Sequence, residues 1–401
     1  MIYNYRMKFK RACVAAALCA ALPLPVALTA CVGVGNNSGS GGDKSGSYTQ
    51  TYYAMDTAAR LAVAGVNKED FEKLSQSVES FLSAAENSLS AARTNSCVYK
   101  FNAAPAGTTV EIDQICYEAL TVAQTLYEST SGYFNPAVYY CEDIYGFAAR
   151  PAGAPAMPYD RMAGDAPTLP DEKYVAAFKE LSSHFSEVVL SQSDGKYYAF
   201  KPNFTVSVEG DENAYSLAID LGGIAKGWCV DKVNEMLDDA GVAYGYFNFG
   251  TSSMGVKKYS GGDGYYTVST GDPRNEDASY MTFKVQDACF STSADSRNFY
   301  EIDGTRYCHV IDPTTGRPVR TGVASATVVG GTAAQADAFT TAIMAMGEER
   351  AVEFINGGYS HLNVAMLIIG GDGAGRIVTN APTYFTAENN NYQFISAVFG
   401  D

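Results

Sequence analysis

The segment 215–241 constrains the fold of this chain more than any other, because alternating residues, two adjacent glycines and a helical pattern follow one another in it. Residues 216–220 alternate as a β-strand does, and 226–240 have the pattern of an α-helix that a glycine closes. Gly222 and Gly223 permit a tight turn with a close backbone approach. The segment predicts a strand, a glycine turn and a helix.

When a protein of this pattern binds phosphate groups, they usually lie at such a turn. The free N–H groups of the turn and the positive end of the helix attract anions, and Lys226 would place a cation beside a pyrophosphate. Most such turns join a strand to a helix and bind nothing. The turn therefore indicates a phosphate site only together with other segments.

Asp337 and Thr341 stand one helical turn apart, where a helix is expected to start. A carboxylate, a hydroxyl and nearby backbone carbonyls are ligands that suit Mg²⁺, which prefers oxygen and keeps water or phosphate oxygens in its other positions. The alternative is an ordinary helix start with Asp337 near the N-cap.

An Asp-Gly pair at 303–304 predicts a hairpin turn between strands at 298–302 and 305–311. His309 would lie on the returning strand, on the same face as Ile311. A histidine with an ordinary pKa can take a proton from a hydroxyl at neutral pH, which makes His309 a candidate general base. The other two histidines are interpreted as structural.

These three segments, in their order along the chain, resemble the ApbE family, the FAD:protein FMN transferases, from about Tyr52 to the C-terminus. The family uses Mg²⁺ and FAD to attach FMN covalently to a threonine or serine of another protein. The resemblance implies an α+β, T-fold-like fold of mixed sheets flanked by helices, with FAD and Mg²⁺ in a cleft between two lobes. It implies metal ligands at the Gly223 carbonyl, Asp337 and Thr341, and a catalytic role for His309.

The resemblance also implies contacts with FAD at Met55, Asn135, Asp220, Lys226 and Ile311. Asp56 stands where the family's Met-Gly-Thr triplet has glycine, Asn135 where aspartate is usual, and Thr251 where a Gly-Gly-Asp motif has its second glycine. A Thr-Ser pair at 292–293 matches a family stretch near the nucleotide, or is an ordinary strand end. The acceptor is expected to be an exported membrane redox or FMN-binding-domain protein.

The first 31 residues predict export. Basic residues precede an apolar stretch at 12–30, which ends in Leu-Thr-Ala-Cys31, the order of a lipoprotein signal in which Cys31 is lipidated. An uncleaved membrane anchor is the alternative. Residues 32–50, rich in Gly and Ser, are expected to be a flexible tether before a domain at 51–401. Both the lipoprotein signal and the uncleaved anchor place the domain on the extracytoplasmic side of the membrane. In the first case the domain is held there by a lipid anchor.

Composition limits the remaining possibilities. With 28 Lys+Arg against 44 Asp+Glu, the chain is not a nucleic-acid binder. An even number of cysteines after Cys31 allows disulfides without fixing their pairing, although Cys229 and Cys308 are interpreted as small buried residues. These cysteines are Cys97, Cys116, Cys141, Cys229, Cys289 and Cys308.

Periodicity predicts an opening strand at 51–64, an amphipathic helix capped by Asn67, and helices at 115–129 and 171–182. Two other functions are compatible with the sequence. One is a Mg²⁺-dependent FAD pyrophosphatase that releases FMN and AMP. The other is a non-catalytic flavin-binding lipoprotein, favoured if the departures at the three motif positions have disabled transfer.

Overall fold

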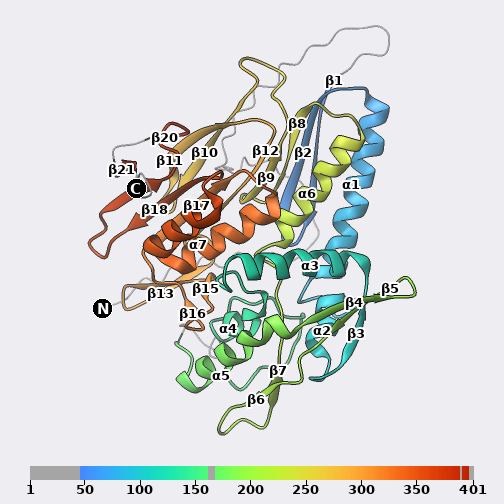
Figure 1. Cartoon of the computed structure of the whole chain (residues 1–401), viewed down its shortest axis with the longest axis vertical. Helices are drawn as coiled ribbons and strands as arrows, with labels where there is room; N and C mark the ends of the chain where they lie inside the picture. The colour runs from blue at the N-terminus through green and yellow to red at the C-terminus, as the bar shows by residue number, and fades with distance from the viewer. Residues whose placement is uncertain (1–45, 161–167, 389–390, 397–401) are drawn as a thin grey trace, which may run out of the picture.

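The computed structural model describes residues 46–160, 168–388 and 391–396 (Figure 1). The expected signal, Cys31 and most of the expected tether lie outside these residues. Within the described ranges, no helix is both long and apolar enough to cross a membrane.

A nine-stranded sheet forms the upper part of the molecule in Figure 1. Its neighbouring strands are antiparallel except for the last pair, which is parallel, so the sheet is mixed. In spatial order the strands are β1 (Gly46–Ala54), β2 (Thr57–Val66), β8 (Tyr244–Phe249), β9 (Ser253–Val256), β12 (Ala288–Ala294), β17 (Val323–Val329), β18 (Asn363–Ile369), β19 (Gly375–Thr379) and β21 (Tyr392–Ser396).

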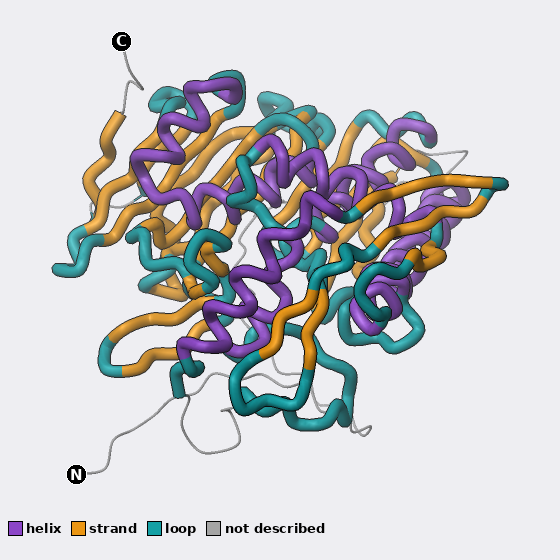
Figure 2. Tube along the Cα trace, turned by 60° about the horizontal axis from the view of Figure 1, so that its bottom comes forward, coloured by secondary structure: helices purple, strands orange, loops and turns teal. Residues whose placement is uncertain are grey.

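The two faces of this sheet are covered differently. Val364, Met366 and Ile368 of β18 belong to the large core under the helices, whereas Ala365 and Leu367 belong to a separate core, because alternate residues of a strand point to opposite faces. Figure 2 shows the helices gathered on one side. The covering elements are α1 (Lys68–Leu89), α6 (Ala225–Asp239) and α7 (Ala333–Phe354) on one face, and a sheet of β10 (Tyr266–Asp272), β11 (Asn275–Val285) and β20 (Phe385–Ala387) on the other.

The lower part of Figure 1 is built from shorter elements around a second core that contains Tyr159, Phe178 and Tyr215. The α+β fold with mixed sheets and flanking helices is thereby confirmed. The remaining elements are α2 (Cys97–Ala103), β3 (Thr109–Ile112), α3 (Gln114–Ser129), η1 (Pro136–Val138), α4 (Tyr139–Ile144), α5 (Glu172–Ser182), η2 (Ser183–Glu187), β4 (Val189–Ser193), β5 (Lys196–Phe200), β6 (Thr205–Ser207), β7 (Ala214–Ser216), β13 (Phe299–Ile302), β14 (Thr305–Cys308), β15 (Ile311–Asp312), β16 (Arg317–Pro318) and η3 (Ile355–Tyr359).

Helices α1, α3, α5 and α6 lie where local periodicity predicted them, whereas α7 begins at Ala333, before the start expected near Asp337. Asn67 caps α1, because its side chain accepts a hydrogen bond from the Asp70 N–H at 2.9 Å. Helices α3 and α5 begin within one residue of their predicted starts, after the caps Asp113 and Asp171.

Two strand predictions differ from the structure. Residues 51–64 form a hairpin rather than one strand, with β1 and β2 joined at a two-residue turn. Strand β1 begins at Gly46, so residues 46–50 belong to the sheet and not to the tether, because their backbone pairs with β2 despite a polar composition.

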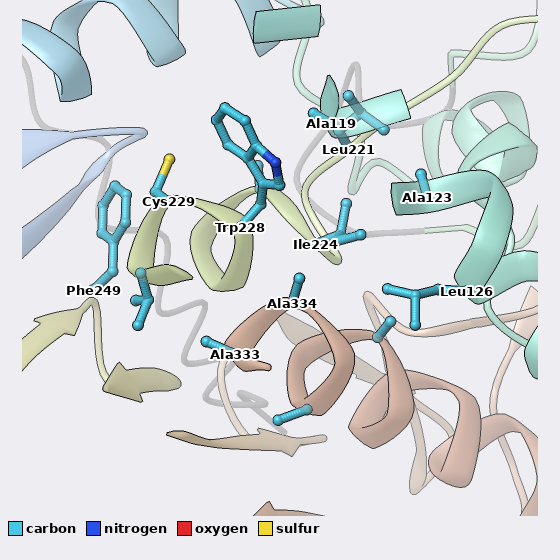
Figure 3. Close-up of a cluster of buried hydrophobic side chains, with 14 of the residues drawn as sticks. Ala119, Ala123, Leu126, Leu221, Ile224, Trp228, Cys229, Phe249, Ala333 and Ala334 are labelled. Atoms are coloured by element: carbon cyan, nitrogen blue, oxygen red, sulfur yellow. The ribbon is translucent and has the colours of Figure 1, made fainter. Parts of the chain in front are cut away.

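Residues 217–220 lie outside a strand, since β7 ends at Ser216. Leu217, Ala218 and Ile219 are all buried, so the predicted alternation of faces is absent here. After them, Leu221 and Ile224 flank the glycine pair and point into the core between α3, α6 and α7 (Figure 3). The residues on either side of the glycine turn are therefore anchored in the hydrophobic core.

Candidate active site

Helices α6 and α7 cross at Gly227. A Cβ atom there would lie 2.4 Å from the Ala333 carbonyl oxygen and 2.8 Å from the Asp337 Cβ, so only glycine permits this approach. The crossing brings the first turn of α6 against the start of α7, and thus the glycine turn against the predicted metal ligands.

Asp337 lies inside α7 and not at its N-cap. The N-cap is Thr332, whose hydroxyl accepts from the Gln335 N–H at 3.0 Å. The carboxylate of Asp337 instead accepts from the Gly227 N–H at 3.0 Å and from the Ser291 hydroxyl at 3.0 Å. The reading of Asp337 as an ordinary helix cap is therefore wrong, and this carboxylate links three distant segments.

Asp231 performs the capping that the sequence suggested for Asp337. From α6 it accepts hydrogen bonds from the N–H groups of Ala333 at 2.6 Å and Ala334 at 2.9 Å, the first two residues of α7. These donors have no partners inside their own helix.

Asp231→Ala should therefore lower the free energy of unfolding by about 1–3 kcal/mol, since two buried donors lose their acceptor. Denaturant unfolding measures the change. Asp239→Ala, at the exposed end of the same helix, is the control and should change stability little. Equal stability of the Asp231 variant and the wild type would show that the cap contributes nothing.

The structure places Gly223 next to the helix that carries the other two predicted metal ligands. A Cβ atom on Gly223 would lie 3.9 Å from the Thr341 Oγ1, and Thr341 is one turn after Asp337 on α7. Burial raises the pKa of Asp337, which is only 4% exposed, while the charge of Lys226 opposes that rise.

This donor set fits Mg²⁺. Each carboxylate oxygen of Asp337 accepts one of the two hydrogen bonds above and retains a further lone pair. A buried carboxylate with a raised pKa gains most from a bound cation. In the described ranges, no cluster of three or more His, Cys, Asp or Glu side chains could hold a metal ion, so a site here would use one carboxylate with neutral oxygens.

The glycine turn is fixed from both sides. The Asp220 carboxylate accepts from the Gly222 N–H at 2.5 Å, and the Lys226 ammonium donates to the Gly222 carbonyl at 2.9 Å. The Asp220 N–H donates to the Pro136 carbonyl at 2.8 Å, which ties the turn to the lower part of the molecule. The turn thus holds Lys226 beside the predicted phosphate site.

His309 lies one residue beyond β14 and not on the strand, because its N–H donates to the Asn298 carbonyl at 2.9 Å after the β14 ladder has ended at Cys308. Burial lowers the pKa of its imidazole to about 4, and the charges of Lys226 and Arg297 add to this effect. Its buried Nδ1 atom has no hydrogen-bond partner in the described part of the chain. His309 is therefore neutral at neutral pH, but its pKa is below the ordinary value expected from the sequence, which makes it a weaker base.

The Met55–Asp56 turn reaches the same region. Both residues have positive φ, 49° and 56°, and aspartate tolerates this conformation better than most residues, so Asp56 can replace a glycine there. A Cβ atom on Gly250 would lie 3.3 Å from the Thr57 Oγ1 and 3.8 Å from the Lys226 Cδ. The turn is thus joined to the site through Gly250.

Asn135 and Ile311 are placed differently. The Asn135 side chain accepts from the Ala137 N–H at 2.9 Å and donates to the Ser182 carbonyl at 3.0 Å. Aspartate could not make the second bond, which explains asparagine here. Ile311 is 3% exposed and packs in the second core. Because both side chains are engaged elsewhere, a contact with FAD at these positions would be made by backbone atoms.

The sequence pattern of the ApbE family matches residues 55–367. This chain belongs to the ApbE family. Similar proteins named FAD:protein FMN transferase occur in Klebsiella pneumoniae, 26% identical over 321 residues (80% of this chain, 83% of that protein), and in Treponema pallidum, 26% identical over 339 residues (81% and 86%).

Solved structures show the ApbE fold in this chain. The flavin transferase ApbE from Vibrio cholerae superposes with a TM-score of 0.65 at 22% identity, covering 84% of this chain and 97% of that structure. The apo form of the Pseudomonas stutzeri flavinyl transferase ApbE gives 0.64 at 23% identity, with 86% and 95% covered. At these identities the likeness concerns the fold.

Three further residues of this ApbE-family chain belong to the site region. Asn102 holds the Ile219 main chain with two hydrogen bonds of 2.8 Å. Burial, followed by the charge of Asp220, raises the pKa of Glu142. Arg297 is an exposed cation near His309. These residues were not identified from the sequence, because each lies in a separate segment of the chain and belongs to no motif.

The departure from the family motif at Thr251 also has a structural explanation. Gly250 supplies the positive φ of that loop, +67°, whereas Thr251 is not among the residues with positive φ. A glycine is therefore not required at Thr251. Two cavities, of about 270 Å³ beside Asn67 and about 530 Å³ beside Asp231, are not lined by the predicted metal ligands, by Lys226 or by His309.

Proposed function

We propose that this protein is a Mg²⁺-dependent FAD:protein FMN transferase that moves FMN from FAD onto a Thr or Ser hydroxyl of an exported acceptor protein and releases AMP. The observation that carries this proposal is the convergence of Asp337, Thr341 and the Gly223 turn, with Lys226 beside them. The names of its family relatives support it.

The binding roles follow from the geometry. Asp337, Thr341 and the Gly223 carbonyl would hold the metal ion, which when bound would offset negative charge on the pyrophosphate of FAD. Lys226 adds a second positive charge at the glycine turn. Asp220 keeps the turn in one conformation through its bond to the Gly222 N–H.

His309 is the proposed general base. Its neutral imidazole takes the proton of the acceptor hydroxyl, and that oxygen attacks the phosphorus of the FMN half of FAD. A new phosphorus–oxygen bond forms with the acceptor, and the bond from that phosphorus to the bridging oxygen breaks. AMP leaves with the bridging oxygen.

The structure weakens the main reason for a non-catalytic protein. Asp56 fits a turn with positive φ, Asn135 makes a bond that aspartate could not, and Thr251 needs no glycine conformation. The three departures from the family pattern are thus accommodated in the fold.

A flavin-transfer assay tests the function. The full chain is incubated with FAD, Mg²⁺ and an acceptor carrying an Asp-Gly-x-Thr/Ser-Gly-Ala-Thr/Ser sequence, and the products are read by in-gel flavin fluorescence and chromatography. Covalent fluorescence with release of AMP is expected, and it should vanish with a chelator or when the acceptor hydroxyl is removed. FMN and AMP without covalent flavin would indicate a pyrophosphatase, and bound but unchanged FAD a flavin-binding protein.

We also propose that the domain is lipid-anchored through Cys31 on the extracytoplasmic face of the membrane, as the order of basic, apolar and Cys31 residues suggests. Mass spectrometry of the mature protein should find a lipidated Cys31 at its N-terminus. Cys31→Ala should release the domain, whereas Cys19→Ala, within the apolar stretch, should not. An intact Met1 in the mature protein would contradict the proposal.

A further inference from the structure

Two thiols meet where helices α2 and α3 begin. Cys97 and Cys116 lie within hydrogen-bonding contact of each other. Asp113 fixes both, because its N–H donates to the Cys97 sulfur at 3.3 Å and its carboxylate accepts from the Cys116 N–H at 2.8 Å. Every cysteine in the described ranges is a free thiol in the structure.

The two thiols differ in acidity. Their contact lowers the pKa of Cys97, and the same contact together with burial raises that of Cys116. A thiol with a lowered pKa is the one that attacks a disulfide, and a neighbouring thiol then completes the exchange. Cys97 is therefore the thiol expected to react first.

Helix α2 connects this pair to the candidate site. Asn102, near its end, accepts from the Ile219 N–H and donates to the Ile219 carbonyl, both at 2.8 Å. The buried Lys201 ammonium donates to the carbonyls of Asn102 and Ala104, both at 2.8 Å. Ile219 immediately precedes Asp220, so α2 is hydrogen-bonded to the segment that leads into the glycine turn.

We propose that Cys97 and Cys116 form a disulfide that ties α2 to α3 and braces the segment before Asp220. The Cys97 thiolate attacks a low-molecular-weight or protein disulfide and releases one thiolate. Cys116 then loses its proton, attacks the Cys97 sulfur and releases the second. The two protein thiols are oxidised and the donor disulfide is reduced to two thiols. Both cysteines are buried, so the exchange takes place during folding or when α2 opens.

Peptide mapping tests the link. Trypsin cleaves after Arg93, Lys100 and Arg161 but not after Arg150, which precedes a proline, so Cys97 lies alone in one peptide and Cys116 shares the next with Cys141. The full chain is incubated folded, or refolded from denaturant, with oxidised and reduced glutathione, and free thiols are then alkylated. The two peptides should be joined, lighter by two hydrogen atoms than their sum, in the wild type and in Cys141→Ser but not in Cys116→Ser.

Thermal unfolding gives a second readout. Closing a loop of this length should raise Tm by about 5 °C, so a reductant should lower Tm by that amount in the wild type and in the Cys141→Ser control. The Cys97→Ser variant should not respond to reductant. Fully alkylated, unlinked peptides in both the folded and the refolded samples would overturn the proposal, whatever the transfer assay shows.

Discussion

Asp337→Ala should abolish Mg²⁺-dependent flavin transfer, with a loss of about 10³-fold or more, because a metal ion typically supplies several kcal/mol to a reaction at phosphorus. Asp337 is the one charged member of the proposed ligand set. Thr341→Val, which keeps the shape and removes a neutral ligand oxygen, should cause a smaller loss. Initial rates across a Mg²⁺ titration measure both effects, and binding of FAD should persist.

Thr340→Val is the matched control, one residue earlier on the same helix. The Thr340 hydroxyl is buried and bonds to the Ser293 hydroxyl at 2.8 Å and to the Asp337 carbonyl at 2.8 Å. Its loss should lower stability without changing the Mg²⁺ dependence of the rate. A wild-type rate for Asp337→Ala at every Mg²⁺ concentration would show that the metal assignment is wrong.

His309→Ala and His309→Asn should bind FAD and Mg²⁺ nearly normally while transfer falls by roughly 10²- to 10⁴-fold, the usual contribution of a general base. FAD affinity and transfer rate are measured on the same preparations. His184→Ala is the control, since that ring stacks on Phe204 with centroids 3.8 Å apart, away from the glycine turn. A folded His309 variant that transfers flavin at the wild-type rate would move the base elsewhere, with Asp312 the next candidate.

The pH dependence gives an independent signature. Burial lowers the pKa of His309 to about 4, so the neutral base should persist down to about pH 5. The kcat/KM of the wild type should be level from neutral pH to that point, fall as the pH passes through about 4, and lose this inflection in the variants.

Stability should follow the same group. In the unfolded chain the histidine has its ordinary pKa of 6.5, above the folded value of about 4, so below pH 6.5 the unfolded state binds more protons. The stability associated with a neutral His309 is therefore lost as the pH falls from about 6.5 to 4. His309→Asn should remove this contribution to acid unfolding, which denaturant titrations at several pH values would detect.

Features that depend on neighbours in the chain could be predicted from the sequence. The cap at Asn67 and the helices α1, α3, α5 and α6 follow from side-chain periodicity and capping, which act within a few residues. The spacing of Asp337 and Thr341 is likewise local. Motif order was sufficient to predict the ApbE fold.

Strand predictions were weaker because a strand requires a partner. Residues 216–220 alternate, yet Ile219 pairs with the Asn102 side chain instead of a neighbouring strand. Residues 46–50 have the composition of a tether, yet β2 offers their backbone a ladder of hydrogen bonds. Composition does not show which segments will lie side by side.

The sequence by itself determined the helices α1, α3, α5 and α6, the glycine turn and the types of residue available for chemistry, because these depend on periodicity and spacing along the chain. Only the tertiary structure decided what each group does. Asp337 accepts from Gly227 and Asp231 caps α7, since the missing side chain at Gly227 lets α6 and α7 approach closely. Burial, which raises the pKa of Asp337 and lowers that of His309, arises from contacts among segments far apart in the chain.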